Sequence, residues 1–166
     1  WQLLASGRPA EAVMEFRRAL DLNPTWIWGY IKMGMAYGVM GDAANTLACV
    51  RRADALLAGA PGLPLTQAWL ATAELLAGDP ARARATLARL ADESRTAFVE
   101  PVAIAWVHYA LGEHDAALTE LERGCALRSP LMAALVQVGP YLWRDIAGDP
   151  RYEALVRRMG LAGAAS

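Results

Sequence analysis

The side chains best suited to chemistry in this sequence are two cysteines and two histidines. Cys49 and Cys125 lie far apart and lack the C-x-x-C spacing of metal and redox sites. We interpret both as reduced, partly buried small residues. His108 and His114 are separated by a turn signal at Gly112, so one helix face does not present both. We expect His108 between helices and His114 in solvent.

The common catalytic motifs are missing from the sequence. It contains no G-x-x-x-x-G-K-[ST] loop, no G-x-G-x-x-G, no H-E-x-x-H and no G-x-S-x-G. We therefore predict no catalytic residue, no metal site and no cofactor, and a protein that is not an enzyme. The net charge of -1, from 16 basic and 17 acidic residues, disfavours a nucleic-acid surface, because such surfaces bind through an excess of positive charge.

The distribution of apolar residues also bears on membranes. No apolar run approaches the roughly 20 residues of a membrane-spanning helix, and the first residues do not form a signal peptide with a basic start. We therefore predict a soluble, cytoplasmic protein with no membrane partner. Trp1 lies inside an apolar helical pattern, from which we expect the chain to continue a longer one.

The elements that must position any binding residue are helices. Apolar residues make up 55% of the chain, many of them alanine, and alanine with leucine, arginine and glutamate favours helix. Gly7, Gly41, Gly78 and Gly112 follow one another at intervals of 34, 37 and 34 residues. Each lies between two helical patterns, so the spacing predicts pairs of helices joined by a left-handed glycine turn.

The second of these units carries the residues of a known repeat. The stretch IWGYIKMGMAYGVMGDAANTLACVRRADAL, residues 27–56, places Tyr30, Met33, Gly34, Tyr37, Gly41, Val50 and Ala53 at the spacing of a tetratricopeptide repeat, which it resembles. The resemblance implies an all-α fold, a right-handed α-α superhelix of about four helical pairs. The repeats would span residues 1–24, as a truncated first unit, and then 27–58, 64–93 and 98–127.

Residues 128–166 depart from this pattern, and we predict that they form capping helices and a tail. We expect a helix at 130–138, a short turn of helix near 141–146 and a closing helix at 150–159. Ser129 and Asp149 each precede a proline suited to a first helical turn. The stretch GDPRYEALVRRMGL resembles the carboxyl-terminal end of repeat regions in large bacterial signalling proteins. That resemblance implies a regulatory setting.

A second apolar stripe on the first helices is the candidate binding site. In tetratricopeptide arrays these positions line a concave groove for peptides. The candidate groove residues are Trp28, Ile31, Met35, Val39, Thr72, Leu76, Val102, Trp106 and Tyr109. Two interpretations stay open: neighbouring units, terminal helices or an upstream domain cover the stripe, or it binds a partner with Trp28 and Trp106 as anchors.

The expected function is therefore a protein–protein interaction scaffold. It would capture a peptide, a partner helix or its own effector domain in the apolar groove. The alternative is a regulatory domain that senses a small apolar ligand between the array and its cap, or that acts through homodimerisation. The basic residues that clamp a terminal carboxylate in some tetratricopeptide proteins are not apparent, since Ile31 and Met35 occupy the corresponding sites.

Overall fold

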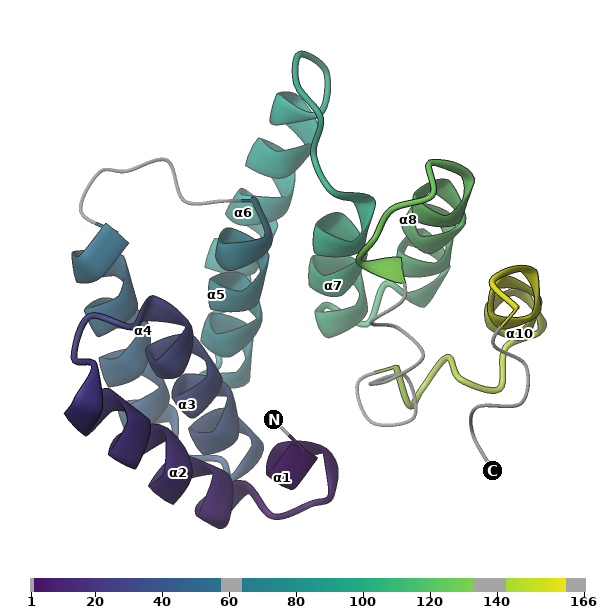
Figure 1. Ribbon diagram of the computed structural model, residues 1–166. Helices are drawn as coiled ribbons and strands as arrows, with labels where there is room; N and C mark the ends of the chain where they lie inside the picture. The colour runs from purple at the N-terminus through teal and green to yellow at the C-terminus, as the bar shows by residue number, and fades with distance from the viewer. Residues whose placement is uncertain (1, 58–63, 133–142, 161–166) are drawn as a thin grey trace.

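The computed structural model describes residues 2–57, 64–132 and 143–160, and every regular element in these ranges is an α-helix. The predicted all-α class is thereby confirmed. The helices, labelled as in Figure 1, are α1 (Gln2–Ala5), α2 (Pro9–Leu22), α3 (Ile27–Val39), α4 (Ala43–Leu57), α5 (Pro64–Leu76), α6 (Pro80–Glu93), α7 (Pro101–Ala110), α8 (His114–Ala126) and α10 (Pro150–Arg158).

A glycine turn joins the two helices of each pair. Gly7, Gly41, Gly78 and Gly112 have φ angles of 73°, 75°, 90° and 77°, which confirms the predicted left-handed conformation. At each turn the residue after the glycine donates its amide to the carbonyl five residues earlier, over 2.8 to 3.0 Å. This bond satisfies a carbonyl that the helix end would leave unpaired, and glycine adopts the required φ without a Cβ clash.

Two helices begin at an aspartate followed by proline. The carboxylate of Asp79 accepts a hydrogen bond from the amide of Arg82 at 3.3 Å, and that of Asp149 accepts one from Arg151 at 2.8 Å. Such a cap stabilises a helix by about 1 kcal/mol, and proline fits the first turn because the amide it lacks would have no partner there. The predicted cap at Asp149 is confirmed.

Consecutive helix pairs pack side by side along the molecule. The first helices form a row in which α3 contacts α5 and α5 contacts α7, while α2, α4 and α6 each contact the first helix of the next pair. The chain runs through these pairs from α1 and α2 to α10, which lies against α8 (Figure 1). The buried apolar side chains fall into four clusters along this row. The core is thus extended, and each pair depends on its neighbours for cover.

Glycines in α3 set the distance to two neighbouring helices. A Cβ placed on Gly34 would lie 3.1 Å from the Cβ of Cys49 in α4, and one on Gly38 would lie 2.6 Å from the Cβ of Leu76 in α5. Helix α3 therefore approaches α4 and α5 more closely than a larger residue allows at either position.

The region after α8 differs in part from the prediction. The predicted helix at 130–138 lies outside the described residues from 133 onward. A short turn of helix is predicted near 141–146, where residues 141 and 142 are not described. The described residues 143–148 form a bend and turns without a helix. Asp149 precedes Pro150 and is extended, with ψ 131°, because proline disfavours helical geometry in the residue before it. The closing helix, predicted at 150–159, is present as α10.

Candidate functional site

The candidate groove residues lie along the row α3, α5 and α7, but their exposure differs. Five are buried: Ile31, Met35, Thr72, Val102 and Trp106. Trp28 and Tyr109 are half-buried. Val39 and Leu76 are exposed, at 58% and 40%. The row therefore offers a partner mainly the two residues at the carboxyl-terminal ends of α3 and α5.

Four of the five buried residues lie in apolar clusters formed with neighbouring helices. Ile31 and Met35 belong to an apolar cluster with α4 and α5, and Trp28 packs against the same cluster. Val102 and Trp106 belong to a cluster with α8, α10 and the turn at 143–148. This arrangement favours the first interpretation of the stripe for these positions, namely cover by neighbouring units and terminal helices.

An aromatic cluster covers the α7 end of the row. The ring centroid of Trp106 lies 4.7 Å from that of Trp69 in α5 and 4.6 Å from that of Trp143, while Tyr109 lies 5.1 Å from Trp143. Trp143 is fully buried. Stacked aromatic rings of this size contribute much of the packing energy where they meet. The turn at 143–148 is therefore anchored on the face where Trp106 was predicted to meet a partner.

A polar contact fixes the same turn. The Tyr109 hydroxyl donates a hydrogen bond to the Asp145 carboxylate at 3.2 Å and accepts one from the Asp145 amide at 3.4 Å. Burial raises the pKa of the Tyr109 hydroxyl. Sequence reasoning assigned no role to Trp143. One sequence feature could have indicated that Trp143 is buried: it is a large apolar residue in a segment that lacks the glycine-turn pattern of the helix pairs.

Exposed apolar side chains gather where α3 and α5 end. Val39, Met40 and Leu76 are 58%, 41% and 40% exposed, and we call them the α3–α5 surface. The two helices meet directly beside it, since Leu76 packs against Gly38. Apolar side chains that are exposed together, rather than singly, are a feature of interaction sites.

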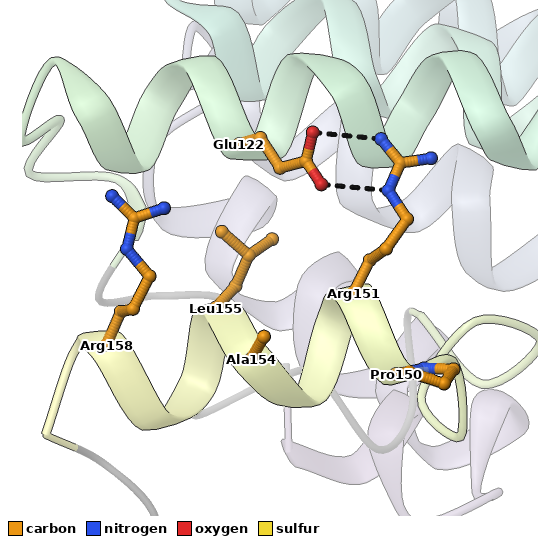
Figure 2. Close-up of a pocket in the computed structure, with 6 residues that line it drawn as sticks. All are labelled: Glu122, Pro150, Arg151, Ala154, Leu155 and Arg158. Atoms are coloured by element: carbon orange, nitrogen blue, oxygen red, sulfur yellow. Dashed lines mark hydrogen bonds and ion pairs between the residues drawn. The ribbon is translucent and has the colours of Figure 1, made fainter.

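Two adjoining pockets lie between α8 and α10 and share Arg158. The first, of about 410 Å³, is lined by Glu122, Pro150, Arg151, Ala154, Leu155 and Arg158. In Figure 2 Arg151 and Arg158 project from opposite ends of α10 toward α8, with Leu155 between them. Arg151 makes two bonds to the Glu122 carboxylate, at 2.8 and 2.9 Å, and this hydrogen-bonded pairing lowers the pKa of Glu122.

The second pocket, of about 500 Å³, lies beyond the carboxyl-terminal end of α8. It is lined by Cys125, Arg128, Ser129, Pro130, Met132, Arg158 and Met159. Its apolar atoms come from methionine, proline and cysteine, and its charge comes from two guanidinium groups. The Ser129 hydroxyl donates to the Glu100 carboxylate at 2.5 Å, which ties this end of α8 to the start of α7.

Two polar residues lie at corresponding positions in α5 and α7, each four residues before the turn glycine. Glu74 is 2% exposed, and its Oε1 lies 2.8 Å from Arg82 Nε without hydrogen-bond geometry. Arg82 also pairs with Asp54 of α4, with 2.6 Å between Arg82 Nη2 and Asp54 Oδ2. Burial raises the pKa of Glu74 to about 7. In α7, His108 Nδ1 lies 2.7 Å from Glu113 Oε2.

The structure gives Cys49 a packing role. The side chain is 5% exposed, and burial raises the pKa of its thiol to about 11, so the reactive thiolate is suppressed near neutral pH. Among the described residues no three His, Cys, Asp or Glu side chains are grouped to hold a metal ion. None of the described helices has the length and apolar character to cross a bilayer.

Comparison of the chain with family models, with curated proteins and with solved structures finds no match. The features of the molecule that bear on function are therefore the helix-pair geometry, the α3–α5 surface and the pockets beside α10.

Proposed function

We propose that this chain is a protein–protein interaction scaffold, built as a right-handed superhelix of the tetratricopeptide type and closed by α10. It would bind a peptide, a partner helix or its own effector domain, without catalysis. The single observation that supports this function best is the α3–α5 surface, whose three apolar side chains are 40% exposed or more.

The position of this surface suggests how a partner would bind. The α7 end of the row is already occupied by Trp143 and its turn. The α3 and α5 ends keep Val39 and Leu76 exposed. A partner segment would therefore lie across the ends of α3 and α5 and bury these side chains, each of which gains roughly 1 to 2 kcal/mol from full burial.

The resemblance to bacterial signalling proteins supports a wider setting for the scaffold. In this proposal the chain forms the carboxyl-terminal part of a cytoplasmic regulatory protein. The bound segment would then come from a partner or from an effector domain of the same protein.

Selection from a displayed peptide library tests this function without a known partner. The purified chain is used to enrich peptides, whose affinity is then measured with Val39→Asp and Leu76→Asp. The matched control is Met14→Asp, a change at another exposed apolar side chain, 53% exposed on α2. The proposal expects both α3–α5 variants to weaken binding about tenfold or more and the control to leave it unchanged. Equal losses in all three variants, or no enriched peptide, would contradict it.

Light scattering at two concentrations tests homodimerisation through the same surface. A mass that doubles in the native chain and stays single in Leu76→Asp would identify a second copy as the partner. A single mass in both would leave a different protein segment as the partner.

A second candidate function has its own support in the pockets between α8 and α10. They lie between the last helix pair and the closing helix, where a small apolar ligand was expected in the alternative prediction. A ligand there would contact both elements and so influence how the closing helix docks. A thermal-shift screen tests this, because a ligand that binds the folded chain raises its melting temperature.

A further inference from the structure

We infer that the pocket lined by Arg128 and Arg158 binds a small monocarboxylate with an apolar body. The carboxylate would lie between the two guanidinium groups, and the body would contact Met132, Met159 and Pro130. This inference rests on the second candidate function, ligand binding beside α10, and is independent of the scaffold proposal.

The charge of the pocket is the first argument. Within the described chain neither Arg128 nor Arg158 forms an ion pair, whereas Arg151 nearby is paired with Glu122. Glu122 is thus already engaged, although it lines the first pocket beside Arg158. Arg158 acts on Glu122 without pairing with it, because its charge helps to lower the pKa of that carboxyl group. Two guanidinium groups without an ion-pair partner among the described residues favour an anion, and each can donate more than one hydrogen bond to a carboxylate.

The backbone at Arg128 is the second argument. Its φ is +54°, and among the described non-glycine residues it alone has a positive φ. The amide of Ser129 donates to the carbonyl of Gly124 at 3.0 Å, which repeats the bond of the four glycine turns. At this turn an arginine takes the conformation that glycine adopts more easily. The guanidinium it adds lines the pocket, and a glycine would leave the pocket without it.

The residues that line the pocket and its volume indicate which chemical group the ligand carries besides its anionic group. Met132 is 3% exposed, and Met159 packs against the same apolar cluster. About 500 Å³ is within the range of small-molecule sites. The pocket also lies at the carboxyl-terminal ends of α8 and α10, whose partial negative charge opposes any anion and opposes a multiply charged phosphate more than a single carboxylate. A single carboxylate on an apolar body fits these features together.

The probe that tests this is octanoate, titrated calorimetrically into the full chain. Arg128→Gln and Arg158→Gln should each weaken octanoate binding about tenfold or more, since each removes charge-assisted hydrogen bonds. Arg157→Gln is the matched control: it is the neighbouring arginine of α10, it pairs with Glu153 at 3.6 Å, and it does not line the pocket. Its affinity for octanoate should equal that of the native chain.

Two comparison ligands separate the charge from the apolar body. Acetate and octan-1-ol should each bind at least tenfold more weakly than octanoate. Equal binding of octanol would overturn the inference and leave the second candidate function standing, whereas no binding of octanoate or octanol would remove both. Circular dichroism checks that each variant is folded. Arg128→Gly serves as a second variant, because it suits the turn and should still lose octanoate binding; full retention of octanoate binding in it would overturn the inference.

Discussion

The buried carboxyl group of Glu74 should make the stability of this protein fall as the pH rises through neutrality. Burial raises its pKa from 4.5 to about 7, against an opposing effect of the Arg82 guanidinium. Asp54 and Asp79 add to the increase by repulsion. Because the folded pKa lies above the unfolded one, the stabilising contribution is complete below the unfolded pKa and is lost as the pH passes the folded pKa.

The size of this effect follows from the shift. One pKa unit corresponds to about 1.4 kcal/mol, so a rise from 4.5 to about 7 corresponds to about 3 kcal/mol in the free energy of unfolding. Most of it, roughly 2 to 3 kcal/mol, should disappear between about pH 5 and about pH 8. That loss is a large fraction of the 5 to 15 kcal/mol typical of a folded domain.

Urea unfolding across this pH range is the assay, with Glu74→Gln as the test variant. Glutamine resembles the protonated carboxyl group, so the variant should match the native chain near pH 5 and exceed its stability near pH 8 by roughly 2 kcal/mol or more. The control is Glu93→Gln, which removes an exposed carboxylate paired with Arg89 at 3.1 Å and should keep the native pH dependence. A native stability that does not change with pH, or the same loss in Glu74→Gln, would refute the reasoning.

Four further substitutions, one of them a control, test the effects of backbone conformation and packing by chemical unfolding. Gly38→Ala should destabilise the chain by about 1 to 3 kcal/mol, because its Cβ would lie 2.6 Å from the Cβ of Leu76, a position that side-chain rotation cannot move; an unchanged stability would show that α3 and α5 separate freely. Gly112→Ala should lower the free energy of unfolding by about 1 kcal/mol through its φ of +77° alone. Its control is Gly148→Ala, whose Cβ meets no atom within 4 Å and which should cost nothing measurable. Equal effects of the two substitutions would contradict the role of the left-handed turn. Arg128→Gly should raise stability by about 0.5 kcal/mol, and a loss would show that its positive φ is not strained.

The helix ends and turns could be predicted from the sequence because they depend on residues that are close together in the chain. The spacing of the glycines predicted where the left-handed turns occur, since few other residues adopt that φ without cost. Aspartate before proline predicted the start of α10 in the same way. Both features depend only on residues that lie within a few positions of one another in the sequence.

The candidate site was less accessible to sequence reasoning because burial depends on distant segments. Trp106 and Val102 have the pattern of an outward-facing stripe, yet Trp143, far along the chain, packs against Trp106. The spacing of apolar residues in α7 does not predict that contact, because Trp143 belongs to a different segment. Likewise, the left-handed Arg128 lacks the glycine signal of the other turns, so its pocket with Arg158 could not be anticipated.

The most direct test of the scaffold proposal is an amide NMR titration of the chain with a peptide selected against it. We expect the largest chemical-shift changes at the ends of α3 and α5, at Val39, Met40 and Leu76. Changes confined to α2, or to α8 and α10, would contradict it, because the peptide would then bind away from the α3–α5 surface.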